Sequence, residues 1–189
     1  MQIQLPYSNT AAEKAQNQQE FPENYTIIDI ETTGLSSLKN EIIELCAIKI
    51  RNNKIVETFT TLVKPQAQIN SFISNLTGIS NDMVSNAPKI ENILNKYIEF
   101  ISDDIVIGHN VKFDIGFINT NSLKHYNKEF ANKYIDTCGL SRKITPIKRH
   151  KLELVAQYYE IDTTGHHRAE QDCLMTFGIY NAMKNTKTL

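Results

Sequence analysis

The sequence contains no tryptophan, three cysteines, and no apolar run near the ~20 residues that a membrane-spanning helix needs. Cys46, Cys138 and Cys173 are odd in number and far apart, which argues against a disulfide framework and against a zinc knuckle. The N-terminus has no basic region followed by an apolar one, the pattern of a secretory signal. We therefore expect a cytoplasmic protein with reduced thiols and no membrane partner.

The chain also lacks an excess of charge of one sign, since its formal net charge is −1. Bulk charge therefore does not indicate a nucleic-acid partner in the way that a strongly basic domain would. Local charge is different, because residues 142–151 contain five lysines and arginines and no acid. This basic segment is either a surface for phosphates or a solvated loop, and its charge alone does not choose between the two.

Length and composition predict one folded domain. The chain has 189 residues, of which 41% are hydrophobic and 22% charged, and these are ordinary proportions for a globular protein with its own core. Residues 1–22 are rich in Gln, Asn and Ala and have no sustained apolar period, which predicts a flexible or partly helical arm. The folded domain is therefore expected to cover residues 23–189.

The strand pattern begins with three β-rich runs and continues with two shorter ones. The predicted strands are residues 25–31, 41–51, 54–63, 105–108 and 133–136. Asn52-Asn53 separates the second strand from the third and is typical of a tight hairpin turn. The first three strands therefore form an antiparallel meander.

Runs with helical spacing alternate with the later strands. The predicted helices are residues 69–76, 90–101, 112–126, 152–159 and 168–184. In the second of these, Leu94, Tyr97 and Ile101 follow the 3.6-residue period of a helix with one buried face. A meander followed by alternating helices and strands predicts an α/β fold, with helices on both faces of a mixed sheet. In such sheets ligands bind at the strand ends where the connections diverge.

The first strand carries two acids, Asp29 and Glu31, which are two positions apart and therefore on one face of the strand. Unpaired carboxylates cost several kcal/mol in a run that should be buried. The strand contains no Lys or Arg, and the turn after it contains Gly34, which allows a ligand to approach the backbone. A divalent cation is the better partner, although an exposed strand face with two ordinary acids would give the same pattern.

Two more acids stand where chain elements change. Asp114 follows the strand at 105–108 and lies in the first turn of a helix. An acid at such a position interacts favourably with the helix dipole, so it needs no other role to be there. Asp172 lies near the start of the last helix, and His167 precedes it in a loop that can reach the same site. A lone histidine is more often structural, and composition alone does not distinguish His167 from its neighbour His166.

Four carboxylates near chain switches are what a two-metal phosphoryl-transfer site needs. Their oxygens favour Mg²⁺ or Mn²⁺ over zinc, and two such ions ~4 Å apart activate a water and stabilise the leaving oxygen. A histidine beside them can take the proton of the attacking water near neutral pH. The candidate metal ligands are Asp29, Glu31, Asp114 and Asp172, and the candidate general base is His167.

Three segments resemble the exonuclease motifs of the DEDD superfamily and occur in the order of that family. They are residues 29–35, 109–114 and 167–172, and residues 134–137 and 151–154 resemble its connecting segments. The sequence is more similar to the branch with a catalytic histidine, because Arg168 stands where the other branch has a tyrosine. That branch is typified by the proofreading epsilon subunit of bacterial DNA polymerase III and by ribonuclease T. Thr77 departs from the pattern, since relatives often have His there.

The resemblance implies an RNase H-like fold and 3′→5′ hydrolysis of nucleic acid to nucleoside 5′-monophosphates. It also implies two metal ions on the four acids, with His167 as the general base. The implied substrate-binding residues are Thr32, Thr33, Leu35, Asn110 and Phe113. The expected substrate is a single-stranded 3′ end, DNA more than RNA, and a DNA polymerase is a candidate partner. An exoribonuclease and a non-catalytic binding module on the same fold remain alternatives, and the sequence does not define an oligomeric state.

Overall fold

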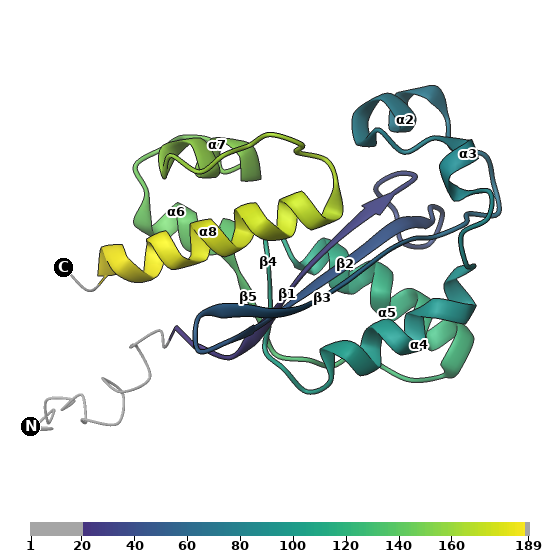
Figure 1. The fold of residues 1–189 in the computed structure, drawn as a ribbon, viewed down its shortest axis with the longest axis horizontal. Coiled ribbons are helices and arrows are strands. Elements are labelled where there is room, and N and C mark those ends of the chain that lie inside the picture. Colours follow the sequence, from purple (N-terminus) through teal and green to yellow (C-terminus); the bar gives the residue numbers. More distant parts are fainter. Residues whose placement is uncertain (1–20, 188–189) are drawn as a thin grey trace, which may run out of the picture.

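A five-stranded mixed sheet is at the centre of the fold (Figure 1). The computed structural model describes residues 21–187. Its strands are β1 (Tyr25–Thr32), β2 (Ile42–Arg51), β3 (Lys54–Leu62), β4 (Val106–Gly108) and β5 (Tyr134–Asp136), in the order β3-β2-β1-β4-β5. β2 pairs antiparallel with β1 and β3, whereas β4 runs parallel to β1 and β5. The prediction of a three-strand meander with two further strands is therefore confirmed.

The turn between β2 and β3 is the predicted hairpin. Asn52 and Asn53 have φ values of 51° and 58°, and two successive positive φ values are those of a type I′ turn, whose twist suits paired strands. β3 lies at the edge of the sheet, and its outer side pairs with none of the described residues. Ile55 and Val56 on this strand are exposed.

Helices cover both faces of the sheet, as predicted (Figure 1). They are α2 (Ser71–Thr77), α3 (Asn81–Val84), α4 (Ile90–Ile101), α5 (Lys112–Tyr126), α6 (Thr137–Ile144), α7 (Leu152–Tyr158) and α8 (Ala169–Lys187). α4 and α5 pack on one face, and α6, α7 and α8 pack on the other. The short helix α3 and the helix α6 were not among the predicted elements.

β1 is buried on both faces, and this determines where its acids point. Ile28 contacts the layer of α4 and α5, whereas Ile27 contacts the layer of α8, and both side chains are fully buried. Each such side chain contributes roughly 1.5–3 kcal/mol of burial free energy, which fixes the register of the strand. Because side chains alternate along a strand, Asp29 and Glu31 share the face of Ile27 and point toward α8.

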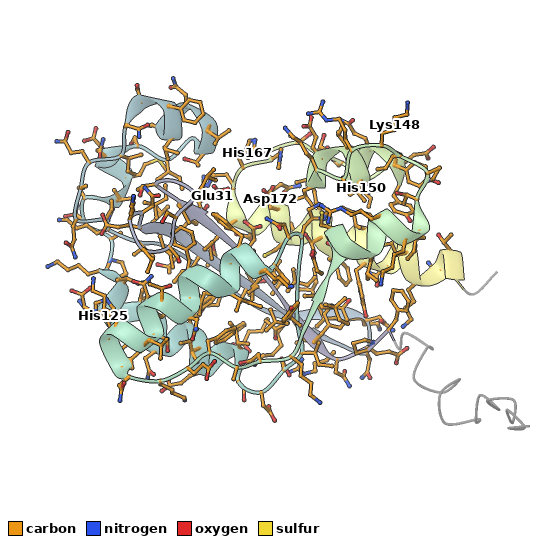
Figure 2. The ribbon with its side chains drawn as sticks, turned by 180° about the vertical axis from the view of Figure 1, so that it is seen from behind. Glu31, His125, Lys148, His150, His167 and Asp172 are labelled. Atoms are coloured by element: carbon orange, nitrogen blue, oxygen red, sulfur yellow. The ribbon has the colours of Figure 1, made fainter. Side chains whose placement is uncertain are left out.

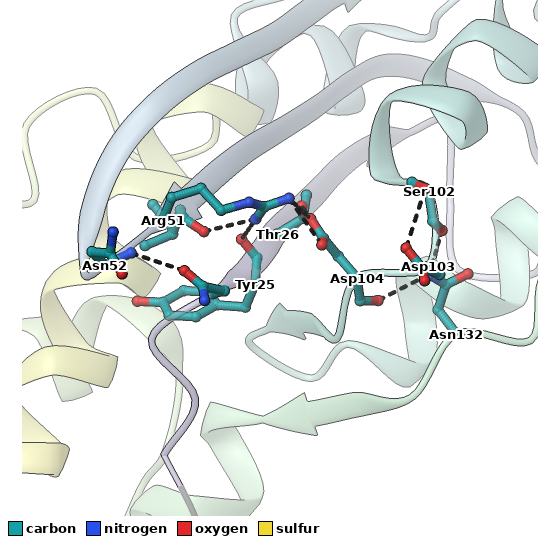
Figure 3. Close-up of polar contacts among 10 residues, drawn as sticks. Tyr25, Thr26, Arg51, Asn52, Ser102, Asp103, Asp104 and Asn132 are labelled. Atoms are coloured by element: carbon teal, nitrogen blue, oxygen red, sulfur yellow. Dashed lines mark hydrogen bonds and ion pairs between the residues drawn. The ribbon is translucent and has the colours of Figure 1, made fainter.

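An ion pair ties the strands together at the end of β1 that lies away from these acids (Figure 3). Arg51 donates from Nη2 to both carboxylate oxygens of Asp104, at 2.9 and 2.8 Å, and Thr26 donates from its hydroxyl to the same carboxylate at 2.5 Å. Asn132 donates to the carbonyl oxygens of Ser102 and Asp104. These contacts join β1, β2 and the turn before β4.

Three aromatic rings close the same end of the sheet. The ring of Tyr180 on α8 lies 5.0 Å from that of Tyr25 and 5.3 Å from that of Phe21, and its hydroxyl donates to the carbonyl oxygen of Pro22 at 3.4 Å. Apart from Phe21 and Pro22, the predicted arm of residues 1–22 lies outside the described residues. Between residues 21 and 187, no helix is long and apolar enough to cross a membrane.

Candidate active site

Three carboxylates meet at the carboxyl end of β1. Asp29 and Glu31 extend from the strand, and Asp172 extends from the first turn of α8. Each offers an oxygen that lies within 4.8 Å of the others. Asp172 is only 5% exposed, and the two strand acids are partly buried. Figure 2 shows Glu31 and Asp172 close together, with His167 beside them.

The electrostatics of this carboxylate cluster are unfavourable without a cation. Burial, and then the charges of Asp114, Asp172 and Glu31, raise the pKa of Asp29 well above its usual range. Burial, and then the charge of Asp172, raise the pKa of Glu31 to about 8, and the Arg168 guanidinium opposes this only in part. Like charges at this spacing cannot all ionise in a poorly solvated site. The cluster is therefore built to receive positive charge.

Asp114 lies next to the cluster, in the first turn of α5. Its Oδ1 accepts a hydrogen bond from the backbone N–H of Ile30 at 3.1 Å, which places it between the two acids of β1. Asp114 is 4% exposed, and burial raises its pKa to about 8 although this hydrogen bond acts in the other direction. The structure thus brings all four predicted acids to one end of the sheet, three within direct reach of a shared ion and the fourth beside them.

The two adjacent histidines have different surroundings. His166 Nδ1 lies 2.8 Å from Oδ1 of Asp172, and this contact raises the pKa of His166. The His167 ring stacks on the His166 ring at 3.8 Å and has no side-chain hydrogen bond within the described residues. Partial burial, and then the charge of His166, lower the pKa of His167. A lowered pKa favours the neutral imidazole of His167, the form that can accept a proton.

An ion pair between the buried Glu44 and the more exposed Arg168 holds the start of α8 against the sheet, and the sequence reasoning missed it. Glu44 on β2 accepts three hydrogen bonds from the Arg168 guanidinium, at 2.7 to 3.3 Å, and one from the backbone N–H of Ala169. Glu44 is 3% exposed and stands opposite Glu31 in the strand register. The only local signal is an acid inside a strongly apolar strand, which implies a buried partner.

The predicted substrate residues after β1 lie in a braced turn. Thr32 donates to the carbonyl oxygen of Gly34 at 2.7 Å, and the hydroxyl of Thr33 accepts from the backbone N–H of Glu41 at 2.9 Å. The side chain of Leu35 is 89% exposed, although it is apolar and the turn beneath it is fixed. The turn that follows the strand of Asp29 and Glu31 thus presents an exposed apolar side chain.

The other two predicted substrate residues stand at the junction of β4 and α5. Asn110 has a φ of 64°, and its backbone N–H donates to Asp136 at 2.8 Å. Phe113 is partly buried with its ring 5.0 Å from that of Phe117. By contrast Thr77, where relatives often have His, is 3% exposed and its hydroxyl donates to the backbone, so it offers no side chain to the site.

A mixed five-stranded sheet with acids at the end of its central strand, and with a histidine beside them, defines the class of an RNase H-like nuclease. The chain belongs to the exonuclease family, whose sequence model matches residues 26–180. This family assignment confirms the predicted resemblance to an exonuclease family.

Individual relatives agree with this family. The chain is 43% identical over 160 residues to a PolC-type DNA polymerase III of Caldanaerobacter subterraneus, a match that covers 84% of this chain and 11% of that protein. It is 39% identical over 157 residues to the DNA polymerase III subunit epsilon of Aquifex aeolicus, covering 82% and 78%. A solved structure of exonuclease X aligns with a TM-score of 0.71 at 25% identity, covering 87% of this chain and 93% of that one. The chain therefore spans about a tenth of the PolC-type relative but most of the other two.

Proposed function

We propose that this protein is a metal-dependent 3′→5′ exonuclease that removes nucleotides from single-stranded 3′ ends and releases nucleoside 5′-monophosphates. The observation that carries the proposal is the carboxylate cluster of Asp29, Glu31 and Asp172, whose oxygens lie within 4.8 Å of one another beside a neutral His167. The family assignment gives this cluster a hydrolytic chemistry.

The donor set fits two divalent cations, and we propose Mg²⁺ or Mn²⁺. Asp29, Glu31, Asp114 and Asp172 offer only oxygen ligands, which suit hard cations. The raised pKa values of Asp29, Glu31 and Asp114 reflect a site that lacks counter-charge. When bound, such ions activate water and neutralise charge on the phosphate. These four residues would hold the ions.

Other residues of the chain would hold the proton and the substrate. His167 would accept the proton of the attacking water, because its lowered pKa keeps the ring neutral near pH 7. The turn of Thr32, Thr33 and Leu35 would contact the terminal nucleotide, its backbone polar groups with the sugar and its leucine with the base. Asn110 and Phe113 would line the opposite side of the same site.

DNA is the favoured substrate and a DNA polymerase the favoured partner. The relatives named above are polymerase III proteins, and the exonuclease X structure is a complex with 5′ overhanging duplex DNA. These facts support a proofreading or repair role. An exoribonuclease and a non-catalytic module remain the alternatives, and the cytoplasmic location stays a prediction.

Digestion of matched 5′-labelled DNA and RNA 20-mers, with Mg²⁺ and with Mn²⁺, tests the proposal. We expect a ladder of shortened DNA strands with 5′-monophosphate products, and we expect Asp29→Asn to abolish it. The matched control is Asp103→Asn, an exposed acid outside the site, which should retain parental activity. If the parent digests neither strand, the proposed exonuclease activity is refuted. If it digests RNA faster than DNA, the exoribonuclease alternative is favoured.

A further inference from the structure

The basic segment of residues 142–151 is the strongest feature that the catalytic site does not use. Its five cationic side chains are exposed, and they are Arg142, Lys143, Lys148, Arg149 and Lys151. None of the five forms an ion pair or a side-chain hydrogen bond with another described residue. A solvated loop would also lack ion pairs, so this absence does not distinguish a loop from a binding surface. The conformation of the backbone in this segment does distinguish them.

That backbone is fixed at both ends of the segment. His150 is the anchor at one end: its carbonyl oxygen lies 2.8 Å from Nε2 of His109, and its Nδ1 lies 2.8 Å from the hydroxyl of Ser141. Because a carbonyl only accepts, the first contact assigns the Nε2–H tautomer to His109. Ile144 and Ile147 pack against the buried layer of α8. The segment is thus ordered before any ligand arrives, which lowers the entropic cost of binding one.

The same anchor places the segment beside the active site. His109 directly follows β4 and precedes the helix of Asp114, so the contact between His109 and His150 joins the basic segment to the catalytic junction. Lys151 is near enough to His167 for its charge to act on that ring. Figure 2 shows Lys148, His150, His167 and Glu31 along the upper side of the molecule, whereas His125 lies at the lower left.

Charge complementarity identifies the occupant. Four clustered acids offer no attraction to a polyanionic strand, and the net charge of −1 gives no general attraction either. The five unpaired cations of the basic segment supply this attraction beside the proposed active site. A nucleic-acid backbone offers phosphates at a spacing that several exposed Lys and Arg side chains can follow.

Resting on the proposed function, we propose that residues 142–151 form a second phosphate-binding surface, which holds the strand several nucleotides away from its 3′ terminus. The surface contributes binding to long strands and nothing to the reaction of a single nucleotide. Its removal therefore raises KM for a long substrate without changing kcat.

The test variant is Lys148→Gln/Arg149→Gln, since both side chains are exposed and unpaired and their loss leaves the anchors of the segment intact. The matched control is Lys96→Gln/Lys128→Gln, which removes the same charge from exposed positions on and beyond the helices of the other face. Binding of a 5′-fluorescein DNA 20-mer is followed by fluorescence anisotropy in EDTA over a range of salt concentrations. Hydrolysis of the p-nitrophenyl ester of thymidine 5′-monophosphate is measured with Mn²⁺.

We expect the test variant to reduce the slope of log Kd against log salt by about 1.4, from two single-strand phosphate contacts of roughly 0.7 each, and the control to leave it unchanged. Ester hydrolysis should be equal in all three proteins. An unchanged slope in the test variant, or an equal change in the control, would overturn the proposal that residues 142–151 bind the strand. A parent that binds the 20-mer but hydrolyses neither ester nor strand would refute the proposed function and leave the surface standing.

Discussion

Neutralising one buried acid of the site should make the metal-free protein more stable while it abolishes activity. Asp114 is suited to this test, because Asp114→Asn keeps an Oδ1 that can accept from the Ile30 N–H, now at 3.1 Å. Burial raises the pKa of Asp114 from an ordinary value of 3.8 to about 8. Because the folded state binds this proton more tightly, the stability of the metal-free protein falls as the pH rises from about 4 to about 8.

The magnitude follows from the same shift. At pH 7 the upper bound is ~4 kcal/mol, from roughly three pH units at 1.36 kcal/mol each. The neighbouring acids are coupled to Asp114, so removing its charge relieves only part of this cost. We therefore expect Asp114→Asn to raise the free energy of unfolding by about 1–3 kcal/mol, or Tm by roughly 2–10 °C for a domain of this size. The stabilisation that Mg²⁺ or Mn²⁺ gives the parent should be strongly reduced in the variant, and its activity should fall at least ~100-fold.

Thermal unfolding by circular dichroism at pH 7.5, in EDTA and then with metal, measures both effects. Asp104→Asn is the matched control, since it removes a charge that is paired with Arg51 at 2.8 Å, and it should lower the free energy of unfolding by about 1–2 kcal/mol. The same Asp→Asn change should thus raise the free energy of unfolding at Asp114 and lower it at Asp104. A lower Tm for Asp114→Asn in EDTA, or an undiminished response to metal, would refute the reasoning.

Three further changes test other contacts. His167→Gln should lower kcat by roughly 10²–10⁴ and remove the loss of rate that we expect of the parent at acidic pH, where an imidazole with a lowered pKa becomes protonated; a pH–rate profile measures both effects. Arg168→Gln leaves the buried Glu44 without its cation and should lower the free energy of unfolding by about 2 kcal/mol, most of which the double variant with Glu44→Gln should recover in urea denaturation. Gly108→Ala would bring a Cβ within 2.7 Å of the Val111 side chain and 3.1 Å of the Ile28 carbonyl oxygen, and should lower Tm through about 1–3 kcal/mol of strain.

The sequence specifies much of this fold because its strongest signals are local. The paired asparagines of the hairpin adopt the two positive φ values that the turn requires, and Leu94, Tyr97 and Ile101 are the buried face of α4. The spacing of Asp29 and Glu31 places both on one face whatever the rest of the chain does. Periods of two and 3.6 residues need no knowledge of distant partners.

Other features depend on contacts that no local pattern contains. α6 begins at Thr137, after the N-cap residue Asp136, whose carboxylate accepts from the backbone N–H of Cys138. Its sequence includes Gly139 and β-branched residues that weaken intrinsic helix propensity. Packing of Leu140 against the α8 layer stabilises it instead. Likewise, the different surroundings of the two adjacent histidines follow from which ring contacts Asp172, and the residue types alone do not reveal this.

The ion pair between Glu44 and Arg168 joins residues 124 positions apart in the chain. Contacts of such long sequence separation form late in folding, because the intervening loop must close first. The carboxylate cluster is completed by the same helix, so a chain still being synthesised carries Asp29 and Glu31 without Asp172. The carboxylate cluster is thus assembled only when almost the whole domain has been made, and a chain that ends before α8 contains only part of the proposed metal site.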